Sequence, residues 1–161
     1  MATYKDLILQ HCAGIVEQVL NNTERYRVGS GKIPVPKEPI LYRWWFPANS
    51  EVVTMLREWR SKDSKEPINL LEGVLTKKFP DGETYYALYF GKSNKGYRRF
   101  IQHSKGNIHT STLRRTIHIL LTDEEYNKPI HERQIDEILK ACYFEWAVID
   151  KEEESLVECI E

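Results

Sequence analysis

Residues 73–90 read GVLTKKFPDGETYYALYF, in which two β-rich runs flank the turn sequence Pro80-Asp81-Gly82-Glu83. Proline, aspartate and glycine between runs of this composition are typical of a β-hairpin. A second aromatic run, ILYRWWF at residues 40–46, stops at Pro47 and predicts another strand, and residues 144–149 predict a further one. The sequence therefore predicts a small, mainly antiparallel sheet.

Helical patterns fill the intervals around these strands. They predict helices at residues 3–21, 51–60, 96–103, 112–121, 130–140 and from 151 onward. Residues 27–39 hold two glycines and three prolines and predict a connector. The order of elements predicts an α+β fold in which helices flank the sheet. Residues 1–38 would form an N-terminal helical extension, and residues 39–161 the main domain.

Composition narrows the class of protein. The chain has 161 residues, of which 41% are hydrophobic and 29% charged, as in one globular domain, which excludes collagen-like and disordered chains. No apolar run approaches the roughly 18 residues that span a bilayer, and the first residues lack the pattern of a signal peptide. Three cysteines without a C-x-x-C pair argue against a disulfide framework and a structural zinc. We therefore expect a cytoplasmic protein without a membrane partner.

The net charge of -1 hides two blocks of opposite sign. Residues 87–122 contain no Asp or Glu and hold seven Lys or Arg and three His, whereas residues 123–161 hold thirteen acidic and four basic residues. A cationic block attracts a polyanion, most commonly nucleic acid. A solvated basic helix balanced by an acidic neighbour explains the pattern equally well.

Two patterns that suggest a bound phosphate or metal fail on spacing. Gly91-Lys92-Ser93 follows a strand, as in a phosphate-binding loop, but the glycine expected five residues earlier is Tyr86. His103, His109 and His118 fit no spacing of metal ligands, so they more often contact phosphate or solvent.

One constellation suits phosphodiester chemistry. Arg99 and His103 are four residues apart and would share one face of a helix. If the strands that carry Tyr42 and Tyr89 are neighbours, this face can lie against both phenols. Phosphodiester cleavage needs a group that orients or deprotonates a nucleophile, a fixed cation and a proton relay. On spacing alone, ordinary half-buried sheet tyrosines remain the alternative.

The same residues resemble, in order, the motifs of the GIY-YIG nuclease superfamily. Ile40-Leu41-Tyr42 would be the first triplet and Tyr89-Phe90-Gly91 the second, although Ile40 and Leu41 depart from the usual glycine and isoleucine. Arg99 and His103 fall at the offsets found in members similar to homing endonucleases, and residues 109–113 resemble the histidine-serine-leucine stretch that follows there. The 46 residues between the motif tyrosines predict a helix and an extra strand, as in restriction-type members.

The resemblance implies a metal-dependent DNA endonuclease with Mg²⁺ or Mn²⁺ as cofactor. Tyr42 would act as general base or water-orienting group, and Tyr89 would hold the attacking water or the scissile phosphate. Arg99 would neutralise the developing charge, and His103 would assist proton transfer or bind phosphate. Further basic side chains would contact DNA phosphates, namely Lys92, Lys95, Arg98, Lys105, His109, Arg114 and Arg115.

The resemblance also implies a metal-binding glutamate near residue 161. Glu161, with Val157 and Ile160 as apolar neighbours, is favoured over Glu158, which lies between other glutamates. The proline and asparagine that follow this glutamate in the family are absent up to Glu161, which is expected of a truncated final motif.

Two other functions stay open. The altered first triplet and the incomplete last motif also suit a catalytically inactive nucleic-acid-binding module on the same fold. A protein-interaction domain, in which the acidic block meets a basic partner, is the third interpretation. The apolar face of the N-terminal helix would either dock on the core or form a homodimer.

Overall fold

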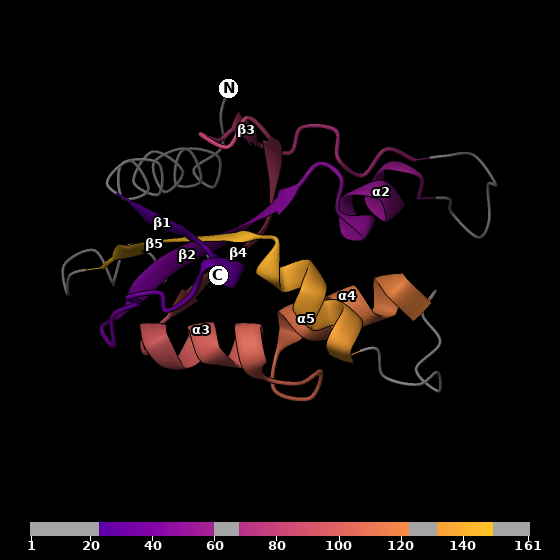
Figure 1. Cartoon of the computed structure of the whole chain (residues 1–161). Coiled ribbons are helices and arrows are strands. Elements are labelled where there is room, and N and C mark those ends of the chain that lie inside the picture. The colour runs from indigo at the N-terminus through magenta and orange to yellow at the C-terminus, as the bar shows by residue number, and fades with distance from the viewer. Residues whose placement is uncertain (1–22, 60–67, 123–131, 150–161) are drawn as a thin grey trace, which may run out of the picture.

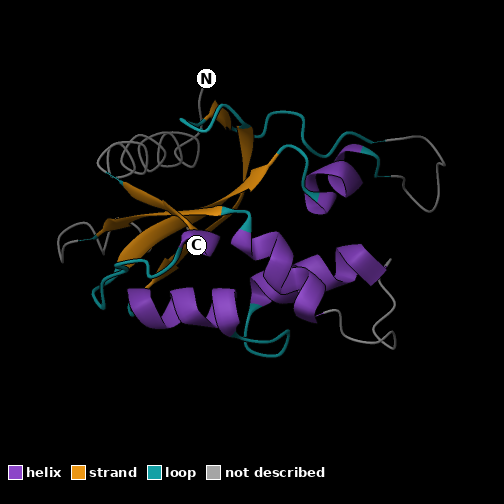
Figure 2. Ribbon diagram, viewed as in Figure 1, coloured by secondary structure: helices purple, strands orange, loops and turns teal. Residues whose placement is uncertain are grey.

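A computed structural model describes residues 23–59, 68–122 and 132–149 as five antiparallel strands and four α-helices (Figures 1 and 2). The strands lie in the order β1-β5-β2-β4-β3. Their bounds are β1 Glu24–Arg27, β2 Ile40–Pro47, β3 Thr76–Lys78, β4 Thr84–Ser93 and β5 Tyr143–Val148. The helices are α2 Glu51–Arg57, α3 Gly96–Lys105, α4 Thr112–Thr122 and α5 Glu132–Lys140, and a short 3-10 turn, η1, covers Val28–Ser30.

The α+β fold is confirmed, and the strands and helices expected between residues 40 and 149 are present with shifts of a few residues at their ends. β1 was not predicted, because its four residues, ERYR, are polar and too few to show alternation. It pairs with β5, so the sheet includes part of the segment assigned to the N-terminal extension. The helices expected at residues 3–21 and from 151 onward lie outside the described residues. No described helix has the length and apolarity needed to cross a membrane.

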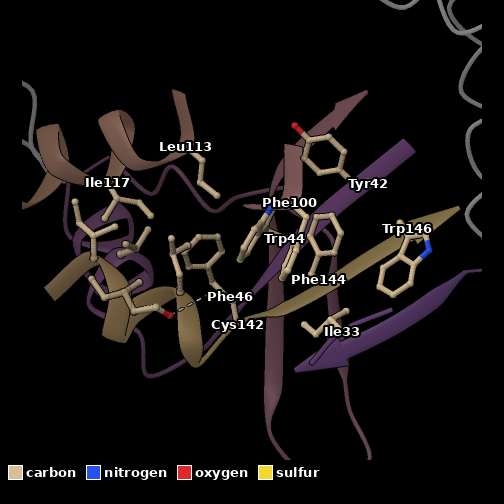
Figure 3. Close-up of a cluster of buried hydrophobic side chains, with 14 of the residues drawn as sticks. Ile33, Tyr42, Trp44, Phe46, Phe100, Leu113, Ile117, Cys142, Phe144 and Trp146 are labelled. Atoms are coloured by element: carbon tan, nitrogen blue, oxygen red, sulfur yellow. Dashed lines mark hydrogen bonds between the residues drawn. The ribbon is translucent and has the colours of Figure 1, made fainter. Parts of the chain in front are cut away.

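The core lies between the sheet and the helices. Along β2, alternate side chains Ile40, Tyr42, Trp44 and Phe46 belong to one large cluster with apolar residues of α3, α4 and α5. Figure 1 shows these three helices gathered on one side of the sheet, and Figure 3 shows the aromatic centre of the cluster. Trp45, from the other set of β2 positions, packs on the opposite face of the sheet. Period-two alternation thus assigns Tyr42 to the helix-covered face.

A β-bulge in β4 decides where its tyrosines point. Trp44 pairs with Tyr89, but the next β2 residue, Trp45, pairs with Ala87, so Leu88 is an extra residue on β4. An extra residue reverses the alternation of the strand beyond it. Tyr85 therefore packs on the far face, whereas Tyr89, four residues later, packs against the helix-side core.

Candidate active site

Three aromatic rings from β2, β4 and α3 meet on the helix-covered face. The ring centroids of Tyr42 and Tyr89 are 6.4 Å apart, and the imidazole of His103 lies 5.6 Å from Tyr42 and 5.4 Å from Tyr89. Figure 3 shows Tyr42 at the border of the core cluster, with its hydroxyl turned away from Trp44 and Phe144. The β2–β4 pairing and the bulge therefore bring together the two phenols that belong to separate motifs.

Gly91 gives Tyr42 the space that it occupies. The two residues are partners across the β2–β4 ladder. A Cβ atom on Gly91 would lie 2.4 Å from the Tyr42 hydroxyl oxygen and 2.5 Å from its Cζ atom, which is far inside contact distance. The phenol thus lies so close to the Gly91 backbone that any larger residue at this position would have to displace it.

His103 is fully buried and is held through both ring nitrogens. Its Nε2 lies 2.9 Å from the Tyr42 hydroxyl, and its Nδ1 lies 2.7 Å from Ser111 Oγ. Ser111 precedes α4, and its Oγ accepts the Arg114 backbone N–H at 3.1 Å, as an N-cap does. Two bonds on opposite sides of the imidazole fix its orientation toward Tyr42.

Ser111 was missed as a site residue by the sequence reasoning. It lies in the stretch at residues 109–113 that resembles the family, but only His109 was taken from that stretch. His109 is exposed, whereas Ser111 is fully buried against His103. The position of Ser111 just before a helical pattern predicts a helix cap. Nothing in the sequence indicates that it contacts His103, which lies eight residues earlier.

Arg99 lies between the tyrosines and an open cleft. The cleft has a volume of about 450 Å³ and is lined by Lys92, Ser93, Asn94, Lys95, Arg98, Arg99 and Gln102. Arg99 Nε is buried and finds no hydrogen-bond partner within the described parts of the chain. Its positive charge is close enough to lower the pKa values of both phenols and of the His103 imidazole. A buried, unpaired guanidinium nitrogen is costly unless a ligand satisfies it, and phosphate oxygens match its geometry.

Burial determines the protonation of the site. It raises the pKa of Tyr42 and of Tyr89, and the Arg99 charge opposes the increase without cancelling it. Burial, together with the charges of Arg99 and Arg114, lowers the pKa of His103 to about 3. At neutral pH both phenols are therefore protonated and the imidazole is neutral. The Arg99 charge alone therefore does not make Tyr42 a phenolate.

The predicted phosphate contacts divide into groups. Lys92, Lys95 and Arg98 line the cleft beside Arg99. Lys105 lies in a second groove, and Arg115 donates to the backbone carbonyls of Ile108 and His109.

Arg114 does not fit the DNA contact predicted for it. It is 1% exposed and forms 2.6 Å ion pairs with Glu132 and Asp136, and its guanidinium also donates to the carbonyl of His103 at 3.3 Å. It therefore cannot reach a DNA phosphate. Its role is to tie α3, α4 and α5 together.

The described residues do not supply a metal site. Within residues 23–59, 68–122 and 132–149, no three His, Cys, Asp or Glu side chains are grouped so that they could hold an ion. The buried carboxylate of Glu145 is already bonded to Arg43, Trp45 and Thr23. Glu158 and Glu161, the predicted ligands, lie outside the described residues.

The antiparallel sheet brings the two motif tyrosines together with the arginine and histidine of α3, beside a basic cleft. This arrangement is that of a nuclease-type domain. A family model described as the GIY-YIG catalytic domain matches residues 40–160. This match covers most of the chain, and the protein belongs to the GIY-YIG family. Searches of curated proteins and of solved structures found no match.

Proposed function

We propose that the protein is an active, metal-dependent DNA endonuclease that hydrolyses phosphodiester bonds. The observation that carries the proposal is the buried Arg99 Nε, which has no hydrogen-bond partner among the described residues, on a side chain that lines a cleft together with Lys92, Lys95 and Arg98. A phosphodiester in the cleft would accept hydrogen bonds from the Arg99 guanidinium, and neighbouring phosphates would meet the other cations.

Each side chain receives a role that its environment permits. Arg99 binds the scissile phosphate and stabilises the charge that grows on it in the transition state. Tyr42, which is protonated at neutral pH, orients the attacking water through its hydroxyl rather than as a resident phenolate. Tyr89, 6.4 Å from Tyr42 between ring centroids, holds the water or a phosphate oxygen.

His103 and Ser111 position Tyr42. Ser111 Oγ accepts the Arg114 N–H and keeps one lone pair and its own proton. When His103 Nδ1–H donates to that lone pair, Nε2 is left as an acceptor for the Tyr42 hydroxyl proton. This tautomer leaves the phenolic oxygen lone pairs free to accept a hydrogen bond from water, which is what a water-orienting role requires.

The divalent cation is proposed from family membership. Mg²⁺ or Mn²⁺ would supply positive charge at the reacting phosphate, and Glu161 or Glu158 would bind it. Because both glutamates lie outside the described residues, the roles above are derived without the cation.

The test is nicking of supercoiled plasmid DNA by wild type, Tyr42→Phe, Arg99→Ala and Lys77→Ala, each with Mg²⁺ and with EDTA. Lys77 is an exposed cation on β3 and serves as the matched control. We expect wild type and Lys77→Ala to nick only with Mg²⁺, and the other two variants to lose about a hundredfold or more in rate. Nicking by Arg99→Ala at the wild-type rate would refute the assignment.

A DNA-binding measurement in EDTA, compared with the nicking assay, distinguishes an active nuclease from a catalytically inactive DNA-binding module. If wild type binds duplex DNA with an affinity that falls with salt but never cleaves it with any divalent cation, the protein is a nucleic-acid-binding module on a nuclease fold.

A further inference from the structure

A second groove runs along the flank of α3 that faces away from the cleft. Its volume is about 660 Å³, and it lies between η1, α3 and α5. Ile33 and Phe100, both buried, contribute to its apolar floor, and Tyr97, a residue that is 43% exposed, also lines it. A pocket of this size suits a ligand of roughly nucleotide dimensions.

The rim of the groove is cationic. Three exposed lysines line it: Lys32 follows η1, Lys105 ends α3 and Lys140 ends α5. Among the described residues, the one carboxylate that lines it, that of Asp136, is already paired with Arg114 at 2.6 Å. Lys140 also meets Glu137 on the open surface at 3.0 Å, a pairing that contributes little. The groove therefore favours an anion with an apolar or aromatic part.

The groove and the cleft lie on two sides of one helix. Arg98, Arg99 and Gln102 of α3 line the cleft, whereas Tyr97, Ile101 and Lys105 of the same helix line the groove. An α-helix with its side chains is about 10–12 Å across. A nucleic-acid strand that leaves the cleft thus needs only a few nucleotides to pass the helix and reach the groove.

We propose that this groove binds an unpaired nucleotide of the substrate strand, with the base stacked on Tyr97 and the flanking phosphates near Lys32 and Lys105. Exposed aromatic rings beside cations are the usual platform for single-stranded nucleic acid. A base within a duplex cannot reach such a ring, because it is already stacked and paired. The inference rests on the proposed function and specifies its substrate as a duplex with a single-stranded extension or flap.

The test is fluorescence anisotropy in EDTA with a blunt DNA duplex and with the same duplex carrying a single-stranded extension of several nucleotides at either end of one strand. We expect the extension on one of the two ends to tighten binding about tenfold, since stacking of one base on an aromatic side chain gives a gain of that order. Tyr97→Phe should keep this gain because it retains the ring, whereas Tyr97→Leu should lose it.

Charge is tested with Lys32→Gln against Lys77→Gln, a matched exposed lysine on β3 at the opposite edge of the sheet. Lys32→Gln should reduce the gain from the extension and its salt dependence, and Lys77→Gln should leave both unchanged. Competition by poly-glutamate as strong as that by single-stranded DNA of equal charge would overturn the nucleotide assignment.

The two proposals fail in different ways. If the blunt duplex is bound and is cleaved with Mg²⁺ but no extension tightens binding, the groove assignment is wrong and the endonuclease stands. If the extension tightens binding through Tyr97 while no substrate is ever cleaved, the groove assignment holds and the catalytic proposal is wrong.

Discussion

Acid should destabilise the protein through His103. The folded state lowers the pKa of His103 from 6.5 to about 3 through burial and the charges of Arg99 and Arg114. Between these two values the unfolded chain binds a proton that the folded chain does not, so stability is fully present above pH 6.5 and falls as the pH drops toward 3. With one pKa unit equal to 1.36 kcal/mol, this single group should remove about 2 kcal/mol between pH 7 and pH 5.

The measurement is urea unfolding of wild type and of His103→Gln at several pH values from 7 to 5. The variant cannot titrate at this position, so its stability should be lower at pH 7 but should fall with pH by about 2 kcal/mol less than that of wild type. Glu145 and Asp81 also have lowered pKa values, but the stability that they contribute is lost at pH values below the range of this measurement. Equal pH slopes for the two proteins would refute the burial of a neutral imidazole.

Three further outcomes follow from the packing. Gly91→Ala should displace the Tyr42 ring, cost about 1–3 kcal/mol in urea unfolding and abolish plasmid nicking; wild-type nicking would contradict the contact. Arg114→Met should lower the free energy of unfolding by about 1–3 kcal/mol, because the carbonyls that Arg114 bonds lose their donor, while Glu132 and Asp136 keep access to water; no measurable loss would show that Arg114 is not the link between the helices. Ser111→Ala should lower kcat about tenfold or more and shift its pH profile, whereas Ser111→Thr keeps the hydroxyl and most of the rate; equal profiles would leave Ser111 a helix cap alone.

The sequence predicts four of the five strands that the structure describes, but not which way all their side chains face. Tyr42 can be assigned to a face by counting from Arg43, the one charged residue of β2, because the other positions of this strand are buried on both faces. Counting along β4 in the same way places Tyr89 on the same face as Tyr85, which is wrong, because the extra residue at Leu88 reverses the alternation. Bulges depend on pairing across strands, and no local pattern in TYYALYF marks one.

The sequence does not show which charged side chains are free to bind a ligand and which are paired inside the protein. Arg114 and Arg115 are adjacent in a basic segment, yet Arg114 is buried in ion pairs and Arg115 is exposed. The partners of Arg114, Glu132 and Asp136, come from the acidic block, 18 and 22 residues later. The two blocks of opposite sign are thus partly one internal contact, which only the packing of α4 on α5 reveals.

The lateral strands of the sheet limit how copies of this protein can meet. β1 has four residues and β3 has three, and the exposed side chains along them include Glu24, Arg27, Lys77 and Lys78. Short, charged outer strands offer few free backbone groups to an incoming strand and oppose its approach. These two outer strands therefore oppose edge-to-edge growth of the sheet into fibrils.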